Sequence, residues 1–218
     1  MDVTYPATFR DSLGEVHTSI HNDGTSLSMK VRGITFTGSD FDALEAPEEI
    51  DVANLSHFRL HSNCLCSCFI DLQIPIPVLT RNAIENGLLF ARIELGDLRP
   101  DGGLNGERVG LELRFGDDSF TSKGTSGWFE GELLDIKNQL PDDTFMRACI
   151  DCAFSDYHPA GSGMFGCMAC FRDNKEAYLS VQSKLDIFRI WDTMTEWVQE
   201  TYQCPEFQRR TPGTGYRG

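Results

Sequence analysis

Polar and apolar residues alternate in short runs along the first part of the chain. Such alternation is typical of β-strands with one face in the core, because successive side chains of a strand point to opposite faces. Turn-forming Asp, Asn and Gly residues separate the runs, and apolar residues at helical spacing occur only late in the chain. The pattern predicts an antiparallel β-sandwich or barrel. We expect strands over residues 5–10, 16–21, 27–32, 34–37, 57–74, 88–95, 109–115 and 120–123.

The strand expected over residues 57–74 is the longest of these. Pro75 and Pro77 are expected to end it, because proline has no N–H to donate to a neighbouring strand. Three cysteines two residues apart fall on one face of this strand, and we interpret them as small core residues. They are Cys64, Cys66 and Cys68.

Two later segments have apolar residues at helical spacing. Residues 128–140 predict one helix, which Pro141 would end. Residues 183–202 predict a longer helix, whose polar face would carry Asp192, Glu196 and Glu200. The whole chain is therefore expected to be α+β and mainly β. An antiparallel β domain over residues 1–141 would precede a cysteine module, the long helix and a basic tail over residues 142–218.

The location of the protein decides how its eight cysteines are interpreted. The first twenty residues contain no apolar core of a signal peptide, and no apolar run of membrane-spanning length occurs in the chain. These absences predict a cytoplasmic protein. In a reducing compartment, clustered thiols bind metal or lie buried more often than they form disulfides.

Two C-x2-C pairs predict one structural zinc ion. Cys149 and Cys152 are separated from Cys167 and Cys170 by 14 residues. Four thiolates at about 2.3 Å complete a tetrahedral zinc shell, which leaves no open position for catalysis. Cys204, placed just before a proline, competes with Cys167 as the fourth ligand, and His158 is another rival. Four buried cysteines without metal remain the simpler alternative.

The net charge of −14 is unevenly distributed. Residues 171–218 hold seven basic and seven acidic residues, so residues 1–170 hold 12 basic and 26 acidic ones. Such a surface repels phosphate backbones and suits a basic protein partner. We therefore expect a non-enzymatic interaction protein, an adaptor or an immunity-type inhibitor, that binds neither membranes nor nucleic acid. Solubility alone would also explain the charge.

An enzyme is the alternative. Motifs of common hydrolases and nucleotide-binding enzymes are missing, so no catalytic residue can be named. A metal-dependent hydrolase or nucleic-acid-processing enzyme would need its site in the β domain. A second metal could then be held by His57, His61 or Cys64.

A set of short segments has a recognisable combination of residues: 34–38, 40–41, 155–161, 165–166, 170–175, 199–207 and 215–218. With these segments the chain resembles a bacterial protein family of unknown function. The resemblance implies a bacterial cytoplasmic setting, brings no activity with it, and draws attention to Cys204 as a zinc ligand.

Overall fold

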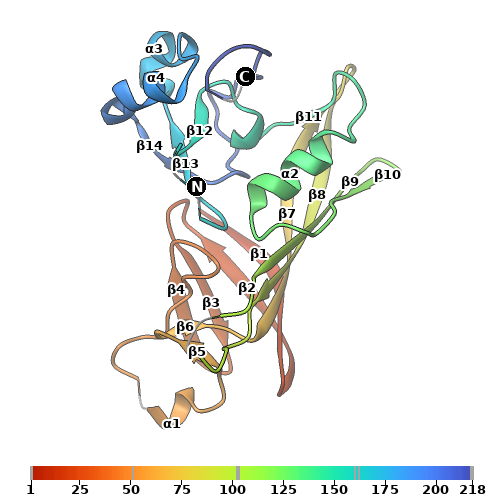
Figure 1. Ribbon diagram of the computed structural model, residues 1–218. Helices are drawn as coiled ribbons and strands as arrows, with labels where there is room; N and C mark the ends of the chain where they lie inside the picture. Colours follow the sequence, from red (N-terminus) through yellow and green to blue (C-terminus); the bar gives the residue numbers. More distant parts are fainter. Residues whose placement is uncertain (1, 51, 102–103, 160, 162, 217–218) are drawn as a thin grey trace.

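A nine-stranded antiparallel sheet forms the largest part of the molecule (Figure 1). The computed structural model describes residues 2–50, 52–101, 104–159, 161 and 163–216. Within them the strand order is β10-β9-β8-β7-β1-β2-β3-β4, and β11 pairs with β7. The strands are β1 (Val3–Asp11), β2 (Gly14–Asn22), β3 (Leu27–Val31), β4 (Ile34–Gly38), β7 (Cys68–Leu79), β8 (Ile84–Leu95), β9 (Arg108–Phe115), β10 (Asp118–Thr121) and β11 (Phe145–Met146).

The expected antiparallel, mainly β fold is confirmed, but the sheet is not a closed barrel. Its order ends with β10 on one side and β4 on the other, and these strands do not pair within the described residues. β1 pairs with β7 over only four residues, from Ala7 to Arg10, so the two halves of the sheet diverge beyond this contact. The outer edge of β4 is instead bridged by Glu45. Closure would need the two end strands to meet, and these contacts leave the sheet open.

The β3–β4 hairpin follows local turn chemistry. Arg32 and Gly33 connect the strands, and both have positive φ angles of 47° and 87°. Two such residues form the tight turn whose twist matches that of paired strands. The Asp11 carboxylate accepts two hydrogen bonds from the Arg32 guanidinium, at 2.6 and 2.7 Å, which ties this turn to the end of β1.

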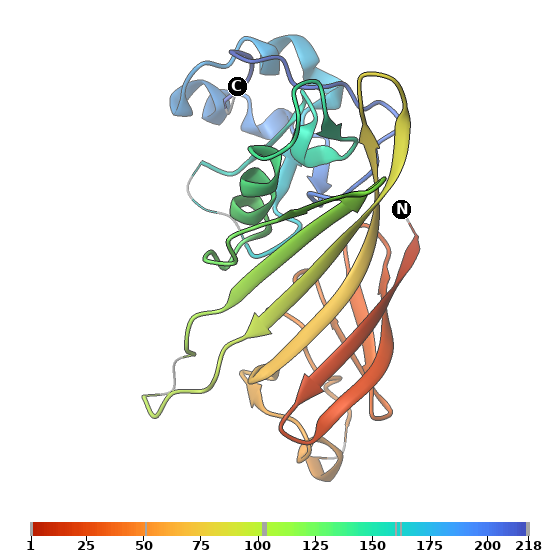
Figure 2. The ribbon, with the colours of Figure 1, turned by 90° about the vertical axis from the view of Figure 1, so that its right-hand side faces the viewer.

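β7 and β8 pair along their whole lengths and reach from the N-terminal hairpins to the C-terminal part (Figures 1 and 2). Pro75 and Pro77 lie inside β7, so the prediction that they end a strand is wrong. Their carbonyl oxygens accept hydrogen bonds from the Gln203 side chain at 2.8 Å and the Arg147 N–H at 2.7 Å. These partners lie on the edge away from β8. Since the N and C=O of one residue point to the same edge, the missing N–H groups do not interrupt the ladder with β8.

The single strand expected over residues 57–74 is also wrong. The chain forms β5 (Leu60–His61), β6 (Cys64–Leu65) and then β7. Ser62, Asn63 and Ser67 have positive φ angles between 48° and 70°, which break an extended strand at two points. Before β5 lies the short helix α1 (Val52–Leu55).

Helix α2 (Phe129–Lys137) confirms the first predicted helix and packs on β9. Its buried face includes Phe129, Leu133 and Ile136. The ring of Phe129 lies 5.9 Å from that of Phe41 and 4.7 Å from that of Phe165, so the helix joins the sheet to the C-terminal part.

The C-terminal part contains a second, smaller sheet at the end of the molecule opposite α1 (Figure 1). Its strands are β12 (Ser155–Tyr157), β13 (Met168–Cys170) and β14 (Glu196–Val198). Its helices are α3 (Lys175–Leu179) and α4 (Lys184–Arg189), and 3₁₀ turns cover Cys149–Asp151, Arg172–Asn174 and Trp191–Thr193.

The long helix expected over residues 183–202 is wrong. Helix α4 stops before Ile190, and residues 196–198 instead pair with β13. Trp191 and Met194, two of the residues at helical spacing, pack on the buried cluster of this small sheet. Tertiary pairing therefore overrides the local periodicity. Among the described helices, none has the length and apolarity needed to cross a membrane.

The basic tail packs on the C-terminal part through two arginines. The Arg210 guanidinium donates hydrogen bonds to the carbonyl oxygens of Cys152, at 3.0 Å, and Ser155. The Arg209 guanidinium lies 4.4 Å from the centre of the Phe145 ring. These contacts hold the tail beside the first C-x2-C pair.

Candidate functional site

Four of the five candidate zinc ligands gather at one place. Cys149, Cys152, Cys170 and Cys204 are all buried. The pKa of the Cys149 thiol is raised well above its usual value, first by burial and then by the charges of the other three. The four thiols therefore lie within electrostatic reach of one another. We call them the cysteine cluster.

Three separate segments supply the cysteine cluster. Cys149 and Cys152 flank a 3₁₀ turn in which the Cys152 N–H donates to the Cys149 carbonyl at 3.1 Å. Cys170 ends β13, which pairs with β12 on one side and with β14 on the other. The Cys149 N–H donates to the Tyr202 carbonyl at 3.0 Å, which brings the segment of Cys204 alongside the first pair. Backbone hydrogen bonds thus place the four thiols.

Cys167 lies apart from the cysteine cluster. It precedes β13, where alternation directs it and Cys170 to opposite faces. The pKa of its thiol is raised by burial and then by the charges of Asp40 and Glu200, two groups outside the cluster. The structure therefore groups Cys204, and not Cys167, with the other three cysteines.

Four cysteines are a ligand set that zinc prefers, but in this structure the cysteine cluster is not arranged as a zinc coordination shell. Zinc is bound in structural sites by four thiolates. In the part of the chain that the structure describes, no group of three or more His, Cys, Asp or Glu side chains is arranged so that it could hold a metal ion. Binding would require these side chains to rearrange.

A buried carboxyl pair joins the large sheet to the C-terminal part. Asp40 accepts hydrogen bonds from the backbone N–H groups of Phe41 at 2.7 Å and Phe165 at 3.1 Å. Glu200 is fully buried and accepts from the Gly166 N–H and the Tyr157 hydroxyl, both at 2.7 Å. Burial raises the pKa of each carboxyl group to about 7.

This junction also contains Cys167 and a pair of amides. A Cβ atom at Gly163 would lie 2.6 Å from Asp40 Oδ2 and 2.7 Å from Cys167 Sγ, so both groups border that glycine. The side chains of Asn22 and Gln199 donate to each other, at 2.6 and 3.0 Å. A thiol with a raised pKa is a poor nucleophile, and both carboxyl groups are already bonded to the backbone or to Tyr157. The junction holds segments together.

The sequence did not reveal this junction. Glu200 was expected on the exposed polar face of the long helix, but it is buried, because the segment is not helical there. Asp40 is one of six acidic residues between positions 40 and 51, and its charge does not distinguish it from the other five. The one available signal was the apolar Phe41 next to Asp40, which indicates that this position lies at the edge of the core.

The remaining metal candidates lie elsewhere. His61 and Cys64 are register partners in the β5–β6 hairpin, and His57 lies outside these strands. The ring of His158 packs against Phe188 at 5.7 Å and Trp191 at 4.6 Å between ring centres.

Comparison with known protein families gives one match. A family of unknown function, DUF6304, matches residues 3–155. The chain belongs to the DUF6304 family. No curated protein and no solved structure matches the chain significantly.

The DUF6304 match includes the large sheet, α2 and the first cysteine pair, and it ends at Ser155 in β12. Cys170 and Cys204 lie beyond it. The resemblance to a family of unknown function is thereby confirmed, and the DUF6304 description adds no activity to the chain.

Proposed function

We propose that the protein is a non-enzymatic interaction protein that presents a carboxylate-rich surface to a basic protein partner. The observation that supports this function is a group of exposed acidic side chains between β4 and α1. Within the described residues, Asp42, Glu45, Glu48 and Glu49 are exposed and form no ion pair. We call these four residues the acidic loop.

Charge accumulates around the acidic loop. The pKa of Glu107 is raised by partial burial and then by the charge of Asp42, so a further carboxylate lies near the loop. Unpaired like charges repel one another, and a basic partner would relieve that repulsion on binding. An adaptor or an immunity-type inhibitor would use this surface for fast, salt-sensitive association.

The experiment compares two variants from which the same number of charges has been removed. In the first, Glu45, Glu48 and Glu49 are replaced by Gln. In the second, the exposed residues Asp117, Asp118 and Asp192 are replaced by Asn as a control. Immobilised protein should capture a basic partner from a bacterial lysate at low salt and release it at high salt. The control should keep the partner, and the acidic-loop variant should lose it. Equal capture by both variants, or no partner at any salt, would refute the proposal.

The proposed function includes one structural zinc ion in the cysteine cluster. Cys149, Cys152, Cys170 and Cys204 would hold it, and the closed shell of four thiolates would stabilise the C-terminal part without doing chemistry. The burial of the four thiols and their mutual electrostatic contact support this ligand set.

Elemental analysis of reduced, purified protein tests the ligand set. We expect one zinc per chain in the wild type and in Cys167→Ser, and loss of zinc in Cys149→Ser and Cys204→Ser. Cys167→Ser is the matched control, because it removes a thiol close in sequence to Cys170 but outside the cluster. Wild-type protein without zinc, or loss of zinc in Cys167→Ser alone, would overturn the assignment. Reconstitution with cobalt(II) would report thiolate ligation by visible absorption.

A metal-dependent hydrolase is the second candidate, favoured by the register pairing of His61 with Cys64. It requires a second metal ion. A zinc content of one per chain that Cys64→Ser leaves unchanged would rule it out.

A further inference from the structure

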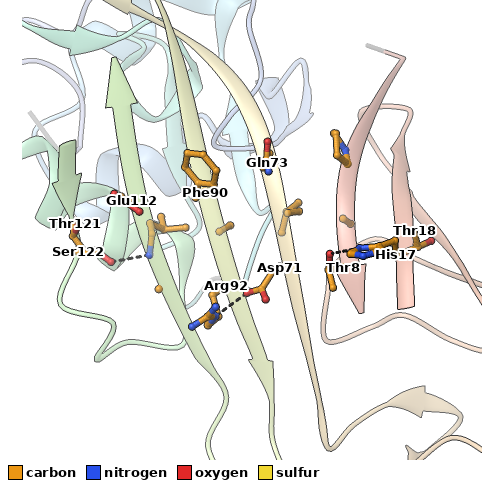
Figure 3. Close-up of a pocket in the computed structure, with 16 residues that line it drawn as sticks. Thr8, His17, Thr18, Asp71, Gln73, Phe90, Arg92, Glu112, Thr121 and Ser122 are labelled. Carbon is orange, nitrogen blue, oxygen red and sulfur yellow. Dashed lines mark hydrogen bonds and ion pairs between the residues drawn. The ribbon is translucent and has the colours of Figure 1, made fainter. Parts of the chain in front are cut away.

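An open trough with a volume of about 770 Å³ crosses the face of the large sheet that lies opposite the core (Figure 3). Residues of β2, β1, β7, β8, β9 and β10 line it in turn, so it runs across the strands. Sites for small ligands commonly have volumes of about 300–1,000 Å³. The acidic loop does not contribute to its lining.

The charged groups of the trough and its rim are already paired. Asp71 lies between Arg10 and Arg92, and its carboxylate accepts from both, with a distance of 2.7 Å to Arg92 Nε. Glu112 accepts two hydrogen bonds from Arg114, both at 2.8 Å. Arg10 also pairs with Glu15 at 3.7 Å, so two carboxylates balance the two arginines around Asp71, and no net charge is left to attract a phosphate or an ammonium group. The chemistry favours a neutral ligand.

Other polar groups of the trough have unused hydrogen-bonding capacity. Within the described residues, the side-chain amide of Gln73 and the hydroxyl of Thr121 have no hydrogen-bond partner. Arg92 uses only Nε for Asp71, which leaves its terminal nitrogen atoms as donors. A ligand that both donates and accepts would match these groups.

An apolar ring lies among them. Phe90 is the register partner of Gln73 on one side and of Glu112 on the other, and the Arg114 guanidinium lies 4.4 Å from its ring centre. Gly110 is the partner of Arg92, and a Cβ atom placed on it would meet no atom within 4 Å. The floor of the trough therefore combines one aromatic ring with free space beside it.

We propose that this trough binds a neutral oligosaccharide. A sugar ring has an apolar C–H face that fits the face of Phe90 not covered by Arg114. Its hydroxyl groups would accept from Arg92 and would both donate to and accept from Gln73 and Thr121. A chain of sugar units also suits a trough that continues across several strands. The proposal goes beyond the protein–protein function, because it uses another surface.

The test uses the full chain and three uncharged probes: cellotriose, maltotriose and triacetylchitotriose. Each is titrated to about 10 mM, which detects a Kd of about 1 mM, while amide chemical shifts are followed by NMR. We expect at least one probe to shift the amides of Gln73, Phe90 and Gly110. Gln73→Ala should weaken this probe about tenfold, because it removes hydrogen bonds to the ligand.

Gly110→Trp fills the free space and should abolish binding. Gly106→Trp is the matched control, since a Cβ there also meets no atom within 4 Å but the residue does not line the trough. The control and the variant with Gln at positions 45, 48 and 49 should both bind the sugar as the wild type does. The proposal is overturned if none of the three sugars shifts these amides, if Gly110→Trp binds as well as Gly106→Trp, or if a neutral Gly/Ser peptide binds and the sugars do not.

Discussion

Replacing Glu200 by Gln should make the protein more stable at alkaline pH. Glu200 is fully buried and its pKa rises to about 7 on folding, mainly because burial disfavours the charged form. Glutamine keeps the geometry, since its oxygen can accept from the Gly166 N–H and its amide can donate to the oxygen of Tyr157. The substitution therefore removes a buried charge and keeps one hydrogen bond to each of the two partners.

The magnitude follows from the two pKa values. The pKa is 4.5 for the unfolded chain and about 7 for the folded one, and each pKa unit corresponds to about 1.4 kcal/mol. The folded state binds the proton more tightly, so the free energy of unfolding falls as pH rises from 4.5 to 7 and then stays low. The cost of the charge is therefore about 2 kcal/mol greater at pH 8.5 than at pH 5.5.

Urea unfolding followed by tryptophan fluorescence, at pH 5.5, 6.5, 7.5 and 8.5, measures this difference. Because wild type and variant are compared at each pH, contributions cancel from titrating groups that do not interact with Glu200. Glu48→Gln, an exposed position, controls for the substitution itself. The stabilisation by Glu200→Gln should grow by about 2 kcal/mol between pH 5.5 and pH 8.5. A constant difference, or one that shrinks as pH rises, would refute the reasoning.

Three further predictions concern packing. Arg210→Met should lower the free energy of unfolding by about 1–3 kcal/mol in urea, because the Cys152 carbonyl loses its donor; an unchanged value would contradict this. Phe36→Ala should lower the free energy of unfolding by about 3–5 kcal/mol in the same assay, since the ring is completely buried. A decrease below about 1 kcal/mol would count against the assigned core. Gly163→Ala should lower the free energy of unfolding by about 1–3 kcal/mol and lower the thermal unfolding midpoint, because the new Cβ would overlap two side chains. Gly106→Ala should leave the midpoint unchanged, since a Cβ there meets no atom within 4 Å.

The sequence correctly predicted the N-terminal hairpins and α2, because residues close together in the chain determine these turns and this helix. The β3–β4 turn needs two residues that accept positive φ angles, and Arg32–Gly33 supplies a glycine at the second position. The break in the strand over residues 57–74 had a weaker signal, because Asn63 favours a positive φ angle but Ser62 and Ser67 do not. Their backbone conformation depends on contacts with distant segments, among them the bond from the Ser67 N–H to the Gly96 carbonyl.

The C-terminal part was harder to predict for a related reason. Apolar residues spaced three to four apart predicted a helix over residues 183–202, but the partner that decides the structure is β13, almost thirty residues before β14. The C-x2-C spacing correctly drew attention to the cysteine cluster, but it grouped Cys167 with the other three cysteines in place of Cys204. Cys167 completes a C-x2-C pair in the sequence, yet strand alternation separates it from Cys170, and the spacing alone cannot show this.

The prolines of β7 have a consequence for how the molecule behaves at high concentration. Where β1 leaves β7, the freed strand edge would ordinarily attract a strand from another molecule and start aggregation. Pro75 and Pro77 offer no N–H at this edge, and their carbonyl oxygens are already occupied by Gln203 and Arg147. This edge of β7 is thus protected against strand addition. The sheet can stay open between β1 and β7 without offering a template for fibres at this point.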